Sequence, residues 1–290
     1  MNAQSIVIKS KKEPSLFLWL LPGGTNFYEG NYTKGTLFAV SEIGLLATSI
    51  FFNNELKKNN DSEYYNYPFL FFNQLYTIEK SDYLLRSLKL KFNKTNFNYK
   101  IPTFSEMLYA PFKLEEIKKP FVLAFIAAGI LDAIISYSIA PKSNGFININ
   151  KVYGYGTEFN STLGTSTYFA TSGLLSYGAG VSEEMLVRGG ILPILDYKYG
   201  KTLGLTVSSI LFSAAHIPSY LNIEDTGQLI YAVTEITAAS FIFGLNAQSN
   251  HYNIKTTIAA HAWFDFIVMT TSWLLNPNEN PLGFSVTFKL

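Results

Sequence analysis

Residues 121–140 read FVLAFIAAGILDAIISYSIA and decide the fold class of this 290-residue chain. The stretch contains one charged residue, Asp132, and lies between Pro120 and Pro141. A helix of this length rises about 30 Å, which matches the hydrocarbon core of a bilayer. We therefore predict that residues 121–140 form a membrane-spanning helix.

Similar apolar stretches occur on both sides of this segment. They cover residues 36–52, about 163–182, 203–217, 227–247 and 256–275. One more aromatic run, over about 64–78, is weaker because Asn73 and Gln74 interrupt it. Six to seven such segments favour an all-α, multi-pass integral membrane helical bundle over a large soluble protein with buried helices.

The composition supports the membrane interpretation and excludes several kinds of site. Charged residues make up 15% of the chain, against about a quarter in soluble domains. The 48% hydrophobic content excludes a disordered chain. The absence of cysteine excludes disulfides, thiol catalysis and thiolate metal ligands. A net charge of +1 gives no reason to expect nucleic acid as a partner, whereas membrane lipid is expected.

The basic residues predict the orientation in the membrane. Residues 79–119 hold nine Lys or Arg against five acidic residues, and other basic residues lie near the N-terminus and in two later connections: Lys9, Lys11, Lys12, Lys198, Lys201 and Lys255. If residues 64–78 also span, alternate threading places these groups on one side, and the positive-inside rule makes that side cytoplasmic. We expect a cytoplasmic N-terminus in a bacterial inner (plasma) membrane.

Two regions are expected. Residues 1–119 form an N-terminal membrane and interfacial region that includes the basic, aromatic-rich segment, and residues 120–290 form a denser helical bundle. Residues 21–35, LPGGTNFYEGNYTKG, are rich in turn-forming residues and are similar to an opening found in several small bacterial membrane proteins, a likeness that implies no activity. Residues 104–119 fit either an interfacial segment or a solvated connector.

The densest group of charges within the apolar helices is Glu183, Glu184 and Arg188. An ionisable side chain inside a membrane helix costs about 2.5–3.5 kcal/mol, so its position is informative. Glu184 and Arg188 are four residues apart and can pair on one helix face. Glu183 is rotated from them by about 100° and is free of that pair. The alternative interpretation is a charge cluster at a helix end near the headgroups.

Two histidines lie in later apolar helices. Phe212 precedes His216 by one turn, and His261 precedes Asp265 by one turn. Taken singly, His216 fits an interfacial histidine, and His261 with Asp265 fits a local His–Asp hydrogen bond. If the helices pack together, a free glutamate, two imidazoles and a further carboxylate converge. Such a set suits hydrolysis by an activated water, or a zinc site with an open position. The spacing is not that of the HExxH zinc motif.

In order along the chain, these motifs resemble the CPBP family of intramembrane proteases, which includes the CAAX prenyl endopeptidases and bacteriocin-processing or immunity proteins. The resemblance covers about residues 120–276. It implies that Glu183 activates water, that Glu184 and Arg188 form a structural ion pair, and that His216 holds the water or a metal. It also implies that His261 with Asp265 completes a metal site or stabilises the oxyanion.

One position departs from the family pattern. Many members have asparagine where this chain has Asp265. An amide donates a hydrogen bond to an oxyanion, whereas an ionised aspartate suits a cation better. The aspartate therefore slightly favours zinc or another divalent metal, held by Glu183, His216, His261 and Asp265. The resemblance implies both metal-dependent and glutamate-dependent members, so both mechanisms stay open.

The sequence thus favours an intramembrane endopeptidase that cleaves membrane-associated or lipidated peptides. The first alternative is a non-catalytic immunity or scaffold protein, in which the polar cluster only packs helices. The second is an ion-coupled transporter, although no inverted repeat is evident. Glu42, Asp132 and Glu235 also lie in apolar helices and are interpreted as polar contacts between helices. The protease hypothesis requires the four site side chains to approach within about 4–5 Å.

Overall fold

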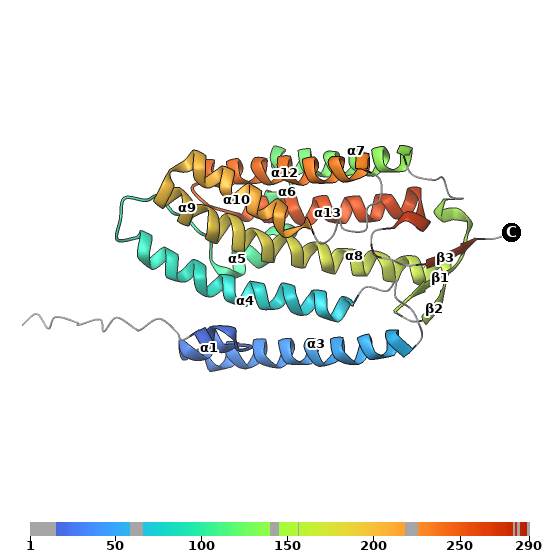
Figure 1. The fold of residues 1–290 in the computed structure, drawn as a ribbon, viewed down its shortest axis with the longest axis horizontal. Helices are drawn as coiled ribbons and strands as arrows, with labels where there is room; N and C mark the ends of the chain where they lie inside the picture. The colour runs from blue at the N-terminus through green and yellow to red at the C-terminus, as the bar shows by residue number, and fades with distance from the viewer. Residues whose placement is uncertain are drawn as a thin grey trace, which may run out of the picture.

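A computed structural model of the chain describes residues 16–58, 66–139, 145–155, 157–217, 226–280, 282 and 285–288. The described residues are mostly helical, which confirms the all-α membrane-type fold (Figure 1). The basic N-terminal residues Lys9, Lys11 and Lys12 lie outside the described residues.

The α-helices are α1 (Leu16–Leu20), α2 (Gly24–Tyr28), α3 (Tyr32–Lys58), α4 (Tyr67–Phe92), α5 (Phe104–Tyr109), α6 (Leu114–Ile117), α7 (Pro120–Ile139), α8 (Ser161–Glu184), α9 (Leu192–Tyr199), α10 (Lys201–Ala215), α12 (Thr226–Ser249) and α13 (Lys255–Leu275). Among the described residues, four helices are long and apolar enough to cross a membrane: α3, α7, α12 and α13. Helices α4 and α8 are equally long but more polar, and α10 is shorter. The expected six to seven spans stay a prediction.

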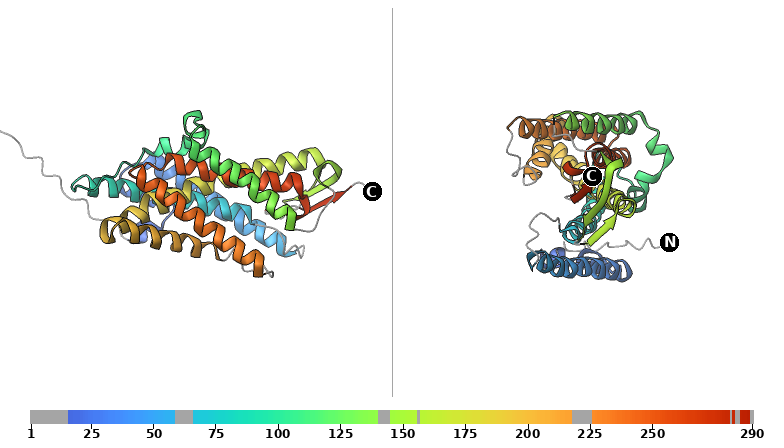
Figure 2. Two further views of the ribbon diagram at one scale, coloured as in Figure 1. Left: turned by 90° about the horizontal axis from the view of Figure 1, so that it is seen from above. Right: turned by 90° about the vertical axis from the view of Figure 1, so that its right-hand side faces the viewer.

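Helices α8 and α13 form the centre of the bundle (Figures 1 and 2). Helix α7 packs along α13, and α12 lies on the same side, against α10. On the other side α4 packs along α8, and α3 lies outermost against α4. The central pair approaches closely because Gly180 of α8 faces the backbone of Ala262 in α13. This contact brings together the two helices that carry most of the candidate residues.

A small antiparallel sheet, which the sequence did not predict, closes one end of the bundle. Strand β1 (Ile149–Gly154) lies between β2 (Thr157–Asn160) and β3 (Ser285–Phe288). The strands are short, and β3 lies far along the chain from its partner, so no local pattern signals the pairing. The side chain of Asn160 then caps α8 by accepting from the Leu163 N–H at 2.9 Å.

The helix after Glu184 widens into a π-helical turn over Met185–Ile191. Pro193 has no N–H, so it cannot donate to the Gly189 carbonyl as an α-helix requires. The Tyr99 hydroxyl donates to that carbonyl instead, at 2.8 Å. Single π turns inside helices occur frequently at functional sites, and this one carries Arg188.

Candidate active site

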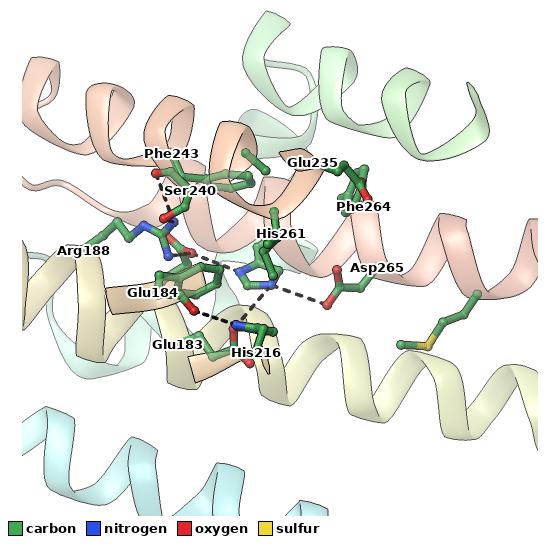
Figure 3. A pocket seen from close by; sticks show the side chains of 14 residues that line it. Glu183, Glu184, Arg188, His216, Glu235, Ser240, Phe243, His261, Phe264 and Asp265 are labelled. Atoms are coloured by element: carbon green, nitrogen blue, oxygen red, sulfur yellow. Dashed lines mark hydrogen bonds and ion pairs between the residues drawn. The ribbon is translucent and has the colours of Figure 1, made fainter. Parts of the chain in front are cut away.

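The candidate residues surround one cavity of about 260 Å³ between α8, the π-helical turn, α10, α12 and α13 (Figure 3). It is lined by Glu183, Glu184, Arg188, Phe212, His216, Glu235, Ile236, Ala239, Ser240, Phe243, His261, Phe264, Asp265 and Met269. All seven motif positions predicted from the sequence are among them. His261 is in the second turn of α13, about 9 Å along the helix from its first residue, Lys255. His261 therefore lies inside the candidate span Lys255–Leu275.

Glu184 and Arg188 form a buried ion pair, with side chains 0% and 2% exposed. Arg188 Nη1 lies 3.0 Å from Glu184 Oε1. Arg188 Nη2 donates to the Ser240 hydroxyl at 3.0 Å and to its carbonyl at 3.2 Å, which links the π-helical turn to α12. The guanidinium also lies 4.2 Å from the centre of the Phe212 ring. Buried charges require such partners, so the pair and its hydrogen bonds define one arrangement of these helices.

The same Glu184 carboxylate orients His261. Glu184 Oε1 accepts from His261 Nδ1 at 3.0 Å while it also faces Arg188. Because this oxygen can only accept, the proton of a neutral His261 is on Nδ1. Its Nε2 then points into the cavity, 3.8 Å from Glu183 Oε2 and 3.5 Å from Asp265 Oδ2.

A backbone contact orients His216 in the same way. Its Nδ1 donates to the Phe212 carbonyl at 2.9 Å, which directs Nε2 toward Glu183 Oε2 at 3.6 Å. The Phe212 ring packs on the imidazole with 4.6 Å between ring centres. Both histidines therefore present Nε2 to the same carboxylate oxygen of Glu183.

Glu183 is the free carboxylate of the pair in α8. No ion pair joins it to Arg188, and its Oε2 is buried without a hydrogen-bond partner among the described residues. Three separations among Glu183, His216, His261 and Asp265 run from 3.5 to 3.8 Å. These values lie within the limit that the protease hypothesis required.

The spacing of these groups is slightly wider than that of zinc ligands. Among the described residues, no group of three or more His, Asp or Glu side chains is arranged to hold a metal ion. Two ligands of a tetrahedral zinc lie about 3.4 Å apart, given bonds of about 2.1 Å, and the three separations here are 3.5, 3.6 and 3.8 Å. Metal binding by Glu183, His216, His261 and Asp265 therefore stays a prediction, and no step below passes through a metal.

The structure adds two polar residues to the cavity. Ser240 accepts hydrogen bonds from Arg188, and a serine within an apolar helix gave no signal in the sequence. Glu235 lines the cavity, although the sequence suggested only a contact between helices. Asp132, interpreted in the same way, accepts a hydrogen bond from Tyr231 at 2.6 Å and so joins α7 to α12.

Comparison with known families gives one match. Residues 165–267 match the family model described as type II CAAX prenyl endopeptidase Rce1-like. The matched segment runs from α8 to α13 and includes all seven motif positions of the candidate site. No curated protein and no solved structure matches the chain.

We predict that Arg188→Met destabilises the fold because it leaves the Glu184 carboxylate buried without its cation. Removing one partner of a buried ion pair costs about 3–5 kcal/mol. Thermal unfolding in detergent, followed by tryptophan fluorescence, measures this. The double variant Glu184→Gln/Arg188→Met should recover part of the lost stability, because neither charge is then unpaired. An unchanged melting temperature in Arg188→Met would contradict the structural role of the pair.

Proposed function

We propose that this chain hydrolyses peptide bonds with a water activated by Glu183, and the match of residues 165–267 to the type II CAAX prenyl endopeptidase Rce1-like model supports a protease. The observation that carries the proposal is the convergence of two oriented imidazoles on one unpaired carboxylate. His216 Nε2 and His261 Nε2 lie 3.6 and 3.8 Å from Glu183 Oε2. Each imidazole has its other nitrogen already occupied by an acceptor.

This arrangement suits a bound water. With both imidazoles neutral, their Nε2 lone pairs face the Glu183 and Asp265 carboxylates, and four acceptors surround one space. A water placed there donates to Glu183 and to one imidazole, which removes the repulsion between acceptors. Glu183 is then the group closest in role to a general base, because it accepts a hydrogen bond from that water and, among the described residues, forms no ion pair with Arg188.

The reaction follows from these positions. Glu183 takes a proton from the water as the water oxygen attacks the carbonyl carbon of the peptide bond, which gives a tetrahedral oxyanion. Glu183 then delivers that proton to the nitrogen of the leaving amine, and the C–N bond breaks. One imidazole takes up a proton from bulk water before the reaction and keeps it throughout; its Nε2–H donates to the oxyanion, the interaction that stabilises such intermediates in a sheltered cavity, while the other imidazole stays neutral and accepts from the attacking water.

Asp265 acts through His261 in this scheme. Its Oδ2 lies 3.5 Å from His261 Nε2, so it supports the imidazolium form by charge and holds the ring in position. An asparagine at this place donates to the oxyanion itself, whereas the carboxylate of Asp265 supplies a charge to the adjacent donor. The substitution changes the source of the hydrogen bond and keeps the catalytic geometry.

The substrate class follows from the depth of the cavity. Its walls belong partly to α12 and α13, which are long and apolar enough to cross a membrane. A membrane-associated or lipidated peptide is the substrate class that these walls favour. CAAX-type endopeptidase activity is the family-level assignment, and a prenyl group is one lipid that meets this requirement.

We predict that Glu183→Gln and His216→Ala each lower the cleavage rate by about 10²–10⁴-fold, the usual contribution of general acid–base catalysis. The assay uses fluorogenic peptides, with and without a prenyl group, and the full chain in proteoliposomes. Melting temperatures within a few degrees of wild type show that the fold is intact. Glu235→Gln is the matched control, since it removes a carboxylate from the same cavity without touching the proposed water.

Full activity in Glu183→Gln would contradict the proposal. A biological activity that survives Glu183→Gln but is lost in Arg188→Met would favour the immunity or scaffold alternative. In that case the buried ion pair matters and the base does not. Uptake that depends on an ion gradient would favour the transporter alternative.

A chelator separates the two mechanisms that the family resemblance implies. The metal-free scheme predicts that cleavage by the reconstituted chain persists after incubation with EDTA and 1,10-phenanthroline. Loss of activity that zinc or another divalent ion restores would contradict the scheme and make Asp265 a metal ligand. The control is a metal-dependent protease, inactivated under the same conditions.

A further inference from the structure

Two sequence features that the proteolytic site does not use meet in a second cavity of about 290 Å³. The turn-rich stretch 21–35 and the basic stretch 79–119 both lie outside the matched segment 165–267. The cavity is lined by Asn26, Asn31, Lys34, Asp82, Leu85, Arg86, Lys89, Ile101, Pro102, Thr103, Phe104 and Met107. Every one of these residues comes from one stretch or the other.

Buried hydrogen bonds fix the turn-rich stretch on α4. Gly23 has a φ of +66°, which lets the chain turn between α1 and α2. Asn26 Nδ2 then donates to Glu79 Oε1 at 2.9 Å, and the Thr25 hydroxyl donates to the same oxygen. Thr25 and Asn26 are 0% and 1% exposed, so this wall of the cavity is part of the folded core.

The charges around the cavity leave one cation without a partner. Asp82 pairs with Lys34 at 2.6 Å and with Arg86 at 3.1 Å, and Arg86 also pairs with Glu29. These two cations are therefore balanced by two carboxylates. Lys89 is exposed, and among the described residues no carboxylate lies within ion-pair distance of it. The cavity thus has a net positive charge at Lys89.

The lining carries more positive than negative charge. Lys34, Arg86 and Lys89 line the cavity together with one carboxylate, that of Asp82. Arg86 Nε and Asn26 Oδ1 have no hydrogen-bond partner among the described residues, but both atoms are buried and are not counted as contacts for a ligand. A ligand of this cavity therefore needs an anionic group for the exposed ammonium of Lys89.

The remaining wall is apolar and lies beside the start of a helix that could span a membrane. Leu85, Ile101, Pro102, Phe104 and Met107 supply it. Asn31 and Lys34 lie at the start of the candidate span Tyr32–Asn53. A ligand in this position has its charged group at headgroup level and its apolar part against the protein, as basic pockets at membrane surfaces allow.

We propose that this cavity binds the phosphate group of an anionic phospholipid. The phosphate oxygens accept from the Lys89 ammonium, and the Lys34 and Arg86 side chains add positive charge around the site. The glycerol and first methylenes of the lipid lie against Leu85 and Phe104. This site is separate from proteolysis, so Glu183→Gln leaves it unchanged.

Native mass spectrometry of the full chain in detergent tests the proposal with three probes: phosphatidylglycerol, phosphatidylcholine and inorganic phosphate. We expect saturable binding of phosphatidylglycerol, weakened about tenfold by Lys89→Gln, since a hydrogen bond to a charged group contributes roughly this much. Lys91→Gln is the matched control, because Lys91 is exposed on the same helix and outside the cavity lining. Lys89→Arg should retain binding.

Equal binding by wild type and Lys89→Gln would overturn the proposal, as would an equal loss in Lys91→Gln. Binding of phosphatidylcholine as tight as that of phosphatidylglycerol would also overturn it. Saturable, Lys89-dependent binding of inorganic phosphate without any lipid binding would assign the cavity to a soluble phosphate and overturn the lipid assignment.

Discussion

The candidate site depends on one buried carboxylate, that of Glu184. A fully buried charge is tolerated only when partners satisfy it, and Glu184 Oε1 has two, Arg188 Nη1 and His261 Nδ1, each at 3.0 Å. Arg188 extends the contact to Ser240 of α12. One oxygen thus connects α8, the π-helical turn, α12 and α13, and its requirement for partners fixes the orientation of the imidazole that faces Glu183.

The division of work between adjacent glutamates follows from helix geometry. A rotation of about 100° per residue places the Glu184 side chain toward the buried interior of the bundle and the Glu183 side chain toward the cavity. The same residue type therefore serves a structural role in one position and stays available for chemistry in the next. The π-helical turn keeps Arg188 within reach of Glu184, and Tyr99 satisfies the carbonyl of Gly189 that Pro193 leaves without a donor.

Much of this could be predicted from the sequence because the signals are local. Apolar stretches of membrane length identified the long helices, and four-residue spacing predicted the Glu184–Arg188 pair and the proximity of His261 to Asp265. The structure places His216 beside the same carboxylate, a contact between distant helices that no spacing encodes. For the same reason the sequence did not predict Ser240, the π-helical turn or the sheet. Each depends on tertiary partners, such as Arg188 or the distant strand β3.

The most direct test of the account is whether Glu183 and His261 act on one water. The test compares the cleavage rates of three variants at equal folded fractions: Glu183→Gln, His261→Ala and the double variant. Residues that act as a unit are non-additive, so the double variant should be no slower than the slower single variant. Losses that multiply in the double variant would show that the two side chains act independently and would contradict the shared water.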